Sequence, residues 1–253
     1  MLAGMAGDKV RALTFGEVAE EYDRVRPGYP AELFEDVLGY SSPATALEIG
    51  AGTGKATRVF ASRGLHVIAL EPDPGMALVL RQHVAELPVT IAMGSLESYE
   101  PEKPVDLVYS AQAFHWTDPE TRWTRTAAAL RPGGSLALFW NIERLVDSEL
   151  RRQTETILSE YELKSPGEWP ESDQPEPHAE MVELSEFSEL RQELYRWERT
   201  LATADYLAHL GTQSAYLMLE DEERDELLDR LRAVLPEPVT LEMATILYLA
   251  KRV

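Results

Sequence analysis

The chain of 253 residues has no cysteine, which excludes disulfide bonds, thiolate metal sites and a cysteine nucleophile. It lacks an uninterrupted apolar run of about 18 residues, and its first residues lack the pattern of a signal peptide. Basic residues number only 24 against 44 acidic ones, a formal net charge of -20 that nucleic acid or an anionic membrane would repel. We therefore expect a cytoplasmic protein that acts on a small molecule, with neither nucleic acid nor membrane as partner.

Two common phosphate-binding patterns are also missing from the most glycine-rich stretch, A-L-E-I-G-A-G-T-G-K-A-T at 46–57. The P-loop would need a glycine at Ile49 and a hydroxyl residue at Ala56. The dinucleotide fingerprint would need its third glycine at Lys55 or at Thr57. What remains is an apolar strand, a glycine turn and a helical pattern, which is the opening unit of a nucleotide-type site.

The charge that precedes the turn narrows the choice of ligand. Glu48 would repel a pyrophosphate but suits a positively charged ligand. The stretch resembles motif I of the class I S-adenosylmethionine-dependent methyltransferases, whose cofactor carries a sulfonium and an ammonium group and no phosphate. The resemblance implies S-adenosyl-L-methionine as cofactor, S-adenosyl-L-homocysteine as product and no metal. It also implies the first cofactor contacts, which are Glu48, Gly50, Ala51, Gly52 and Gly54.

A second acid stands at the spacing that this reading requires. The apolar run at 65–70 ends at Glu71, 19 positions after Gly52. At the carboxyl end of a parallel strand, such an acid can accept hydrogen bonds from both ribose hydroxyls of an adenosyl group. The alternative is a solvated acid that begins the E-P-D-P turn.

The resemblance extends to the residues expected around the adenine ring. Pro72 and Met76 correspond to family positions that pack on the ring, although Met76 is equally consistent with an ordinary core residue. Ser95 and the backbone of Leu96 follow the expected third strand and correspond to the positions that meet the adenine amino group.

The fourth expected strand, at 105–110, leads into A-Q-A-F-H-W. By the resemblance its end lines the methionine portion of the cofactor through Ser110, Ala111 and Gln112. His115 is the only one of five histidines at this predicted edge, and an ordinary imidazole pKa of about 6.5 suits a general base. Trp116 offers an aromatic wall for a planar acceptor. The alternative is that F-H-W packs the next helix onto the sheet and His115 is structural.

Further acceptor contacts are expected from two other segments. Residues 15–29 contain F-x-x-x-A-x-x-Y-D-x-x-R-P-x-Y, which is similar to a helix that folds over the cofactor in small-molecule methyltransferases. By that resemblance Tyr22 approaches the cofactor while Arg26 and Tyr29 border the acceptor; the alternative is a helix that caps the core. Trp140 and Asn141 end the fifth expected strand on the same side.

The whole pattern predicts an α/β fold: a Rossmann-like seven-stranded sheet, mostly parallel, with strand seven antiparallel and helices on both faces. Four parts are expected, namely capping helices at 1–40, the cofactor-binding core at 41–141, a helical acceptor-specific lid at 142–192 and the completion of the core at 193–253. The expected helices are 31–40, 57–63, 119–130, 203–219 and 221–235, and the later strands are 89–93, 135–140, 193–201 and 239–251, with R-P-G-G at 131–134 as a tight turn.

The predicted function is methyl transfer to an oxygen, nitrogen or carbon atom of a small-molecule metabolite, as in secondary metabolism. His115 would remove or direct the proton of an acceptor that carries one. Two alternatives remain open. A nicotinamide-dependent oxidoreductase would use the same fold but a complete G-x-G-x-x-G, and a non-catalytic S-adenosylmethionine-binding protein would look almost the same in sequence.

Overall fold

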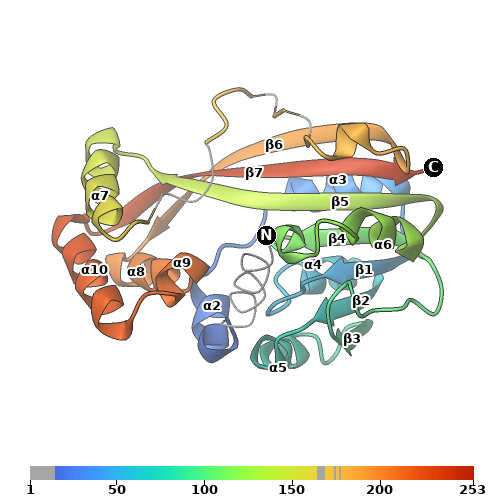
Figure 1. Ribbon diagram of the computed structural model, residues 1–253, viewed down its shortest axis with the longest axis horizontal. Helices are drawn as coiled ribbons and strands as arrows, with labels where there is room; N and C mark the ends of the chain where they lie inside the picture. The colour runs from blue at the N-terminus through green and yellow to red at the C-terminus, as the bar shows by residue number, and fades with distance from the viewer. Residues whose placement is uncertain (1–14, 164–168, 174, 177) are drawn as a thin grey trace. The chain divides into compact units, whose positions relative to one another are not determined.

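The computed structural model describes residues 15–163, 169–173, 175–176 and 178–253 (Figure 1). The side chain of Phe15, which the sequence assigns to the N-terminal helix, and residues 164–168, 174 and 177 of the predicted lid at 142–192 lie outside the described residues. None of the described helices is long and apolar enough to cross a membrane.

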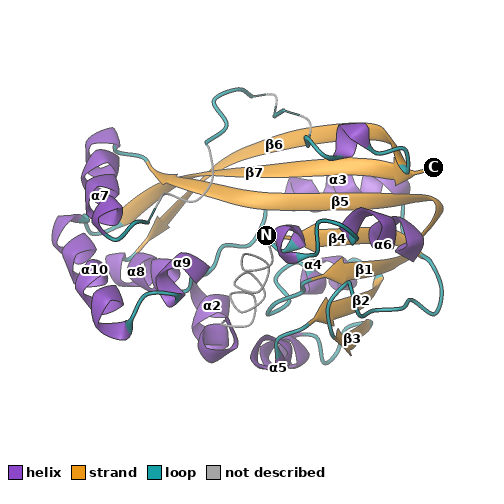
Figure 2. Ribbon diagram, viewed as in Figure 1, coloured by secondary structure: helices purple, strands orange, loops and turns teal. Residues whose placement is uncertain are grey.

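Seven strands form one sheet in the order β3-β2-β1-β4-β5-β7-β6, with β7 antiparallel to the other six (Figure 2). The short strands at its centre read as apolar runs because parallel strands covered by helices are buried on both faces. Ala46 and Leu47 of β1, for example, are fully buried. The predicted fold class is confirmed. The strands are β1 Thr45–Ile49, β2 His66–Glu71, β3 Val89–Met93, β4 Val105–Ala111, β5 Leu130–Leu145, β6 Phe187–Leu201 and β7 Val239–Arg252.

Helices follow most strands, and several match the predicted ranges within a residue or two. One predicted helix, at 203–219, is wrong. It ends at Gly211 because Gln213 adopts an extended backbone, with φ -80° and ψ 141°, before the chain turns helical again. The helices are α2 Ala19–Val25, α3 Ala31–Ser41, α4 Thr57–Ser62, α5 Pro74–His83, α6 Arg122–Ala129, α7 Ser148–Glu160, α8 Thr203–Gly211, α9 Ser214–Leu217 and α10 Asp221–Val234, with single turns η1 Phe15–Val18, η2 Phe114–Trp116 and η3 Met181–Glu183.

The strands on one side of the sheet are longer than predicted, and the tight turn expected at 131–134 is part of β5. The pairing of β4 with β5 is parallel, with Val105 opposite Leu130 and Leu107 opposite Ser135. Between these two pairs the chain advances by two residues on β4 but by five on β5. The R-P-G-G segment is therefore accommodated as a bulge. The prediction of a turn at 131–134 is wrong because a bulge and a turn use the same types of residue.

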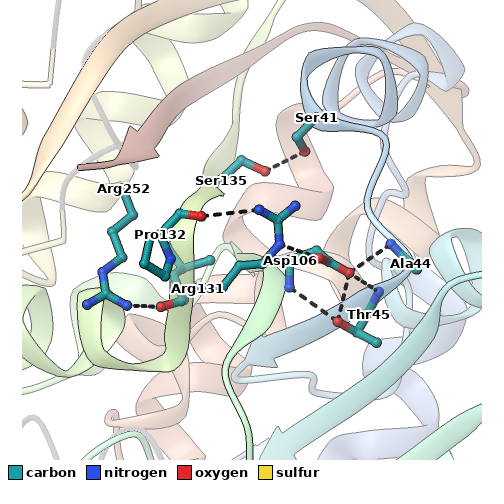
Figure 3. A network of polar contacts seen from close by, with 9 residues as sticks. Ser41, Ala44, Thr45, Asp106, Arg131, Pro132, Ser135 and Arg252 are labelled. Atoms are coloured by element: carbon teal, nitrogen blue, oxygen red, sulfur yellow. Dashed lines mark hydrogen bonds and ion pairs between the residues drawn. The ribbon is translucent and has the colours of Figure 1, made fainter.

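A polar network fastens this bulge to the amino-terminal ends of the central strands (Figure 3). Arg131 donates from Nε to Oδ1 of Asp106 at 2.6 Å. The other carboxylate oxygen of Asp106 accepts from the backbone N–H groups of Ala44 and Thr45 at 3.0 and 2.9 Å. Burial alone would raise the pKa of Asp106, but these hydrogen bonds outweigh it and lower the pKa to about 2. The network lies at the opposite end of the strands from the predicted site.

The chain divides into two compact units. One contains residues 28–140, 172–195 and 245–253, and it includes β1 to β4 with their helices. The other contains residues 1–27, 141–171 and 196–244, and its core groups Leu145 and Leu158 with Tyr206, Leu227 and Met243. We call them the sheet-edge unit and the helical unit.

Candidate active site

The glycine turn after β1 combines two tightly packed glycines with one that faces open space. All three have positive φ angles: +70° at Gly50, +58° at Gly52 and +89° at Gly54. A Cβ at Gly50 would lie 2.4 Å from Cβ of Ala113, and one at Gly54 would lie 2.5 Å from Cδ1 of Leu80. At Gly52 a Cβ would meet no atom of the described residues within 4 Å. Gly52 is therefore the position where a ligand can approach the backbone.

Glu71, at the end of β2, is fixed beside this space. Its Oε2 accepts from the backbone N–H of Gly52 at 2.7 Å, and its Oε1 accepts from the N–H of Asp73 at 2.8 Å. Burial raises the pKa of Glu71 to about 7 against the effect of these two donors. Asp73 caps α5 by accepting from Gly75 and Met76. The alternative role proposed for Glu71, starting the turn before α5, thus belongs to Asp73. Each oxygen of Glu71 can still accept another hydrogen bond.

Glu48 of β1 is buried. Its Oε2 accepts from the hydroxyls of Thr57 and Tyr109 at 2.5 and 2.8 Å. Burial is the main cause that raises the pKa of Glu48 to about 8, and the nearby charge of Glu71 adds to it. A cationic ligand close to this carboxyl would favour its ionised form.

The residues expected around the adenine ring lie on the neighbouring edge of the sheet. The N–H of Gly94 donates to the carbonyl of Glu71 at 3.1 Å, which brings the segment after β3 beside the end of β2. Ser95 is half-buried and its backbone bonds both ways with the hydroxyl of Ser98 at 3.1 Å. Leu96 and Met76 are buried, and Pro72 is half-buried.

Polar atoms at the end of β4 bond to the neighbouring strands. The hydroxyl of Ser110 donates to the carbonyl of Ile49 at 2.8 Å, so this buried side chain fastens β4 to β1. Gln112 has a φ of +62°, an uncommon backbone conformation for a residue with a side chain. Its N–H donates to the carbonyl of Phe139 at 3.0 Å. Ala111, between them, is half-buried.

An aromatic group lies where β4 ends beside β5, because Ala111 pairs with Phe139, the residue before Trp140. Trp140 and Asn141 do not end the fifth strand as predicted, since β5 continues to Leu145. His115, on η2, is exposed, and its ring centroid lies 4.6 Å from that of Trp116. Trp140 of β5 donates from Nε1 to Nδ1 of His115 at 3.4 Å. His178 lies 6.1 Å from Trp140 and 5.2 Å from Tyr248, ring centroid to ring centroid. Burial lowers the pKa of His178, which favours its neutral ring.

The remaining candidates do not all belong to the same unit. Tyr29 packs in the sheet-edge unit, with its ring centroid 4.8 Å from that of Phe139. Tyr22, Arg26 and Asn141 belong to the helical unit. In that unit Cζ of Arg26 lies 4.9 Å from the ring centroid of Tyr22, and Nε of Arg26 donates to the hydroxyl of Thr212 at 2.9 Å.

Sequence reasoning missed the residues that support the candidates. Tyr109 holds Glu48 and looked like an ordinary strand residue, and Tyr248 of β7 is far from the site in sequence. The sequence around His178 allows entry into the acceptor pocket but favours a solvated loop, whereas in the structure its ring lies beside Trp140 and Tyr248. Asp73 had a usable signal, because Asp before Pro and Gly is a common helix start.

Comparison with known proteins identifies the family. Residues 47–138 match the methyltransferase domain family. An uncharacterised methyltransferase of Mycobacterium tuberculosis is 34% identical over 232 residues, which cover 88% of this chain and 86% of that protein. The chain belongs to the class I S-adenosylmethionine-dependent methyltransferases and is an enzyme. Membership decides against a nicotinamide-dependent oxidoreductase and against a protein that only binds the cofactor.

Two solved structures share the fold. One, from Anaeromyxobacter dehalogenans and provisionally assigned as a type II methyltransferase, has a TM-score of 0.63 at 22% identity and covers 89% of this chain and 97% of that one. The second is Haemonchus contortus phosphoethanolamine N-methyltransferase 2, which was solved with phosphomonomethylethanolamine and S-adenosylhomocysteine. It has a TM-score of 0.51 at 17% identity and covers 94% of this chain and 57% of that one.

The site described above fits an adenosyl cofactor. The space at Gly52 admits a ligand to the backbone, and the fixed carboxylate of Glu71 beside it is an acceptor for hydroxyl groups. The buried acid Glu48 suits a cationic ligand better than a phosphate.

Proposed function

We propose that this methyltransferase acts on a small-molecule metabolite at the carboxyl edge of β1, β2, β4 and β5. The observation that carries the proposal is the contact of Trp140 with His115 at 3.4 Å, because it joins an indole and an imidazole at the edge that also bears Glu71. An exposed imidazole next to two indole rings suits a flat or amphipathic acceptor. The net charge of -20 supports an acceptor other than nucleic acid, and a cytoplasmic location accords with it.

The chain's own residues would hold the cofactor as follows. Glu71 would accept from the ribose hydroxyls, Gly52 would let the ligand reach the backbone, and Glu48 would favour the cationic end. Further contacts would come from Gly50, Ala51, Gly54, Pro72, Met76, Ser95, Leu96, Ser110, Ala111 and Gln112. The cofactor contact of Tyr22, a residue of the helical unit, stays a prediction from the sequence. When bound, S-adenosylmethionine supplies a methyl group that its sulfonium already activates.

On the acceptor side, the protein contributes orientation more than acid–base chemistry. Because the methyl group is activated beforehand, the main tasks of the protein are to align the acceptor and to exclude water. The acceptor-facing residues we propose are His115, Trp116, Trp140 and Tyr29. The acceptor contacts of Arg26 and Asn141, which belong to the helical unit, stay predictions from the sequence. The segment 142–192 is proposed as the acceptor-specific lid. The methylated atom is an oxygen, nitrogen or carbon.

The proposal is tested in two stages with the full chain. Calorimetric titration with S-adenosylhomocysteine, with NADH in parallel, should give micromolar binding of the former alone. Transfer of labelled methyl from S-adenosylmethionine is then measured on panels of small carboxylic acids, phenols, amines and heteroaromatic compounds, with RNA and protein as further acceptors. Transfer to RNA or protein but to no small molecule would overturn the proposed acceptor class, and binding of NADH alone would overturn the proposed cofactor site.

A further inference from the structure

The contact between Trp140 and His115 fixes where the imidazole carries its proton. The indole nitrogen of tryptophan is a hydrogen-bond donor only. It donates to Nδ1 of His115 at 3.4 Å, so that nitrogen must present its lone pair. A neutral imidazole has one protonated and one unprotonated nitrogen, and the proton of His115 is therefore on Nε2.

The indole also packs against two further rings of the sheet-edge unit. Trp140 is half-buried in β5, and its ring centroid lies 6.1 Å from that of Tyr248 at an interplanar angle of 66°. His178 lies at the same distance with its plane tilted by 30°, and it meets Tyr248 at 90°. These contacts come from three separate segments of the sheet-edge unit. These ring contacts limit the rotation of the indole and help to fix the direction of its N–H.

We propose that Trp140 is a positioning residue that keeps His115 in the Nε2–H tautomer, so that His115 serves the acceptor as a hydrogen-bond donor and not as a general base. This inference rests on the proposed function, which takes His115 to face the acceptor. The Nδ1 lone pair is committed to Trp140, and Nε2 already carries a proton. A substrate group that meets Nε2 must itself offer a lone pair, such as a carboxylate, a carbonyl oxygen or an unprotonated ring nitrogen.

This role differs from the general base that the sequence suggests. A base would have to receive the acceptor's proton on a free lone pair, and the only lone pair of the neutral ring points at an indole donor. Hydrogen bonding through Nε2–H instead selects and orients an acceptor. Alignment of this kind is the contribution that methyl transfer requires from a protein.

A second histidine in the same unit provides an internal reference. Nδ1 of His83 lies 3.1 Å from the carbonyl oxygen of Thr53. A carbonyl only accepts, so Nδ1 of His83 carries the proton and its ring is the opposite tautomer. One spectrum of the protein should therefore show both forms.

The test is a long-range ¹H–¹⁵N correlation spectrum of protein labelled at histidine, recorded at about pH 8, where ordinary imidazoles are neutral. The ring signals of His115 are assigned by their loss in His115→Gln. We expect a protonated Nε2 and an unprotonated Nδ1 for His115, with the reverse for His83. In Trp140→Phe, which keeps an aromatic ring against His178, the two His115 signals should move towards each other as both tautomers become populated.

The matched control is Trp116→Phe, which alters the other indole beside His115 and should leave both tautomers unchanged. A protonated Nδ1 at His115 in the unsubstituted protein would overturn the proposal, and so would a His115 spectrum that Trp140→Phe does not change. This readout needs no acceptor, so it stands or falls separately from the proposed function.

Activity measurements then distinguish a hydrogen-bond donor from a general base at His115. They use the best acceptor found in the panel of the proposed function. His115→Gln places an amide N–H near the position of Nε2 and should keep kcat/KM within about threefold, whereas His115→Asn places its amide near Nδ1 and should lose about tenfold or more. Equal losses in the two variants would contradict the donor role, because neither amide can act as a base.

Discussion

The carboxylate of Glu71 accepts a hydrogen bond of 2.7 Å from the backbone N–H of Gly52, the glycine whose missing Cβ leaves open space among the described residues. This bond joins the end of β2 to the turn after β1. The acid proposed to bind the ribose therefore also holds the turn that would admit the cofactor. Binding and local structure are coupled through a single side chain.

The first prediction concerns this carboxylate. Glu71→Ala should weaken binding of S-adenosylhomocysteine by about 1–3 kcal/mol, because it removes a hydrogen-bonding partner of the ligand and loosens the Gly52 turn. Calorimetric titration measures the change. A matched control is Glu100→Gln on the surface of the same unit, which should bind as the unsubstituted protein does. Unchanged affinity in Glu71→Ala would remove the ribose assignment.

The second prediction compares two glycines of similar backbone conformation, one that is needed for packing and one that is needed for ligand binding. Gly50 and Gly52 have φ angles of +70° and +58°, so alanine costs each of them about 1 kcal/mol of backbone strain. Only at Gly50 does the new Cβ collide with Ala113, at 2.4 Å. Gly50→Ala should therefore lower the free energy of unfolding clearly more than Gly52→Ala does.

Cofactor affinity should show the reverse order. In Gly52→Ala the new methyl group enters the open space, so binding of S-adenosylhomocysteine should weaken at least tenfold in a protein that remains folded. Urea denaturation and calorimetry on both variants test the pair. Normal affinity in Gly52→Ala would mean that the ligand does not approach this part of the backbone.

The buried central strands of the sheet and the position of its glycine turn follow from short-range patterns. The run from Ala46 to Ile49 is apolar because both faces of β1 are covered, and the acid at the end of β2 is recognised by its spacing from Gly52. Such features need only a strand, a turn and a count of residues.

Long-range packing did not follow from the sequence in the same way. His178 approaches Trp140 only because its loop returns to the sheet, and nothing near His178 in sequence encodes that contact. The hydrogen bond from the hydroxyl of Ser110 to the carbonyl of Ile49 was not predicted either, because it depends on how β4 lies against β1.

The third prediction uses the raised pKa of Glu48, which is about 8. A carboxyl that binds its proton more tightly in the folded state stabilises the fold at low pH, and that contribution is lost as pH rises from its ordinary value of 4.5 through 8. Glu48→Gln stays neutral and can still accept from Thr57 or Tyr109. Between about pH 5 and pH 9 it should therefore gain stability relative to the unsubstituted protein, by on the order of 4 kcal/mol.

Urea denaturation at several pH values, without cofactor, measures this difference. The comparison isolates Glu48 because all other titrating groups are common to both proteins. A difference that stays constant with pH would contradict the raised pKa and would indicate that Glu48 is ionised in the folded protein throughout this range.

The last prediction concerns Asp106 at the other end of the strands, whose pKa is lowered to about 2 (Figure 3). Here the sign is opposite: a depressed pKa stabilises the fold above the ordinary value of 3.8, and the contribution is lost as pH falls from there through 2. Asp106→Asn keeps an oxygen for the N–H groups of Ala44 and Thr45 but loses the ion pair with Arg131.

At pH 7 this variant should therefore be less stable by about 1–2 kcal/mol, since the lost partner is a charge-assisted hydrogen bond. The difference should shrink when urea denaturation is repeated at about pH 3.5 and then pH 3, because at these pH values Asp106 takes up a proton in the unfolded chain while it stays largely ionised in the folded protein. Glu35→Gln, which removes a surface pair with Arg63, should change stability by less than about 0.5 kcal/mol. An equal deficit for Asp106→Asn at every pH would mean that the network acts through packing alone and not through the charge of its carboxylate.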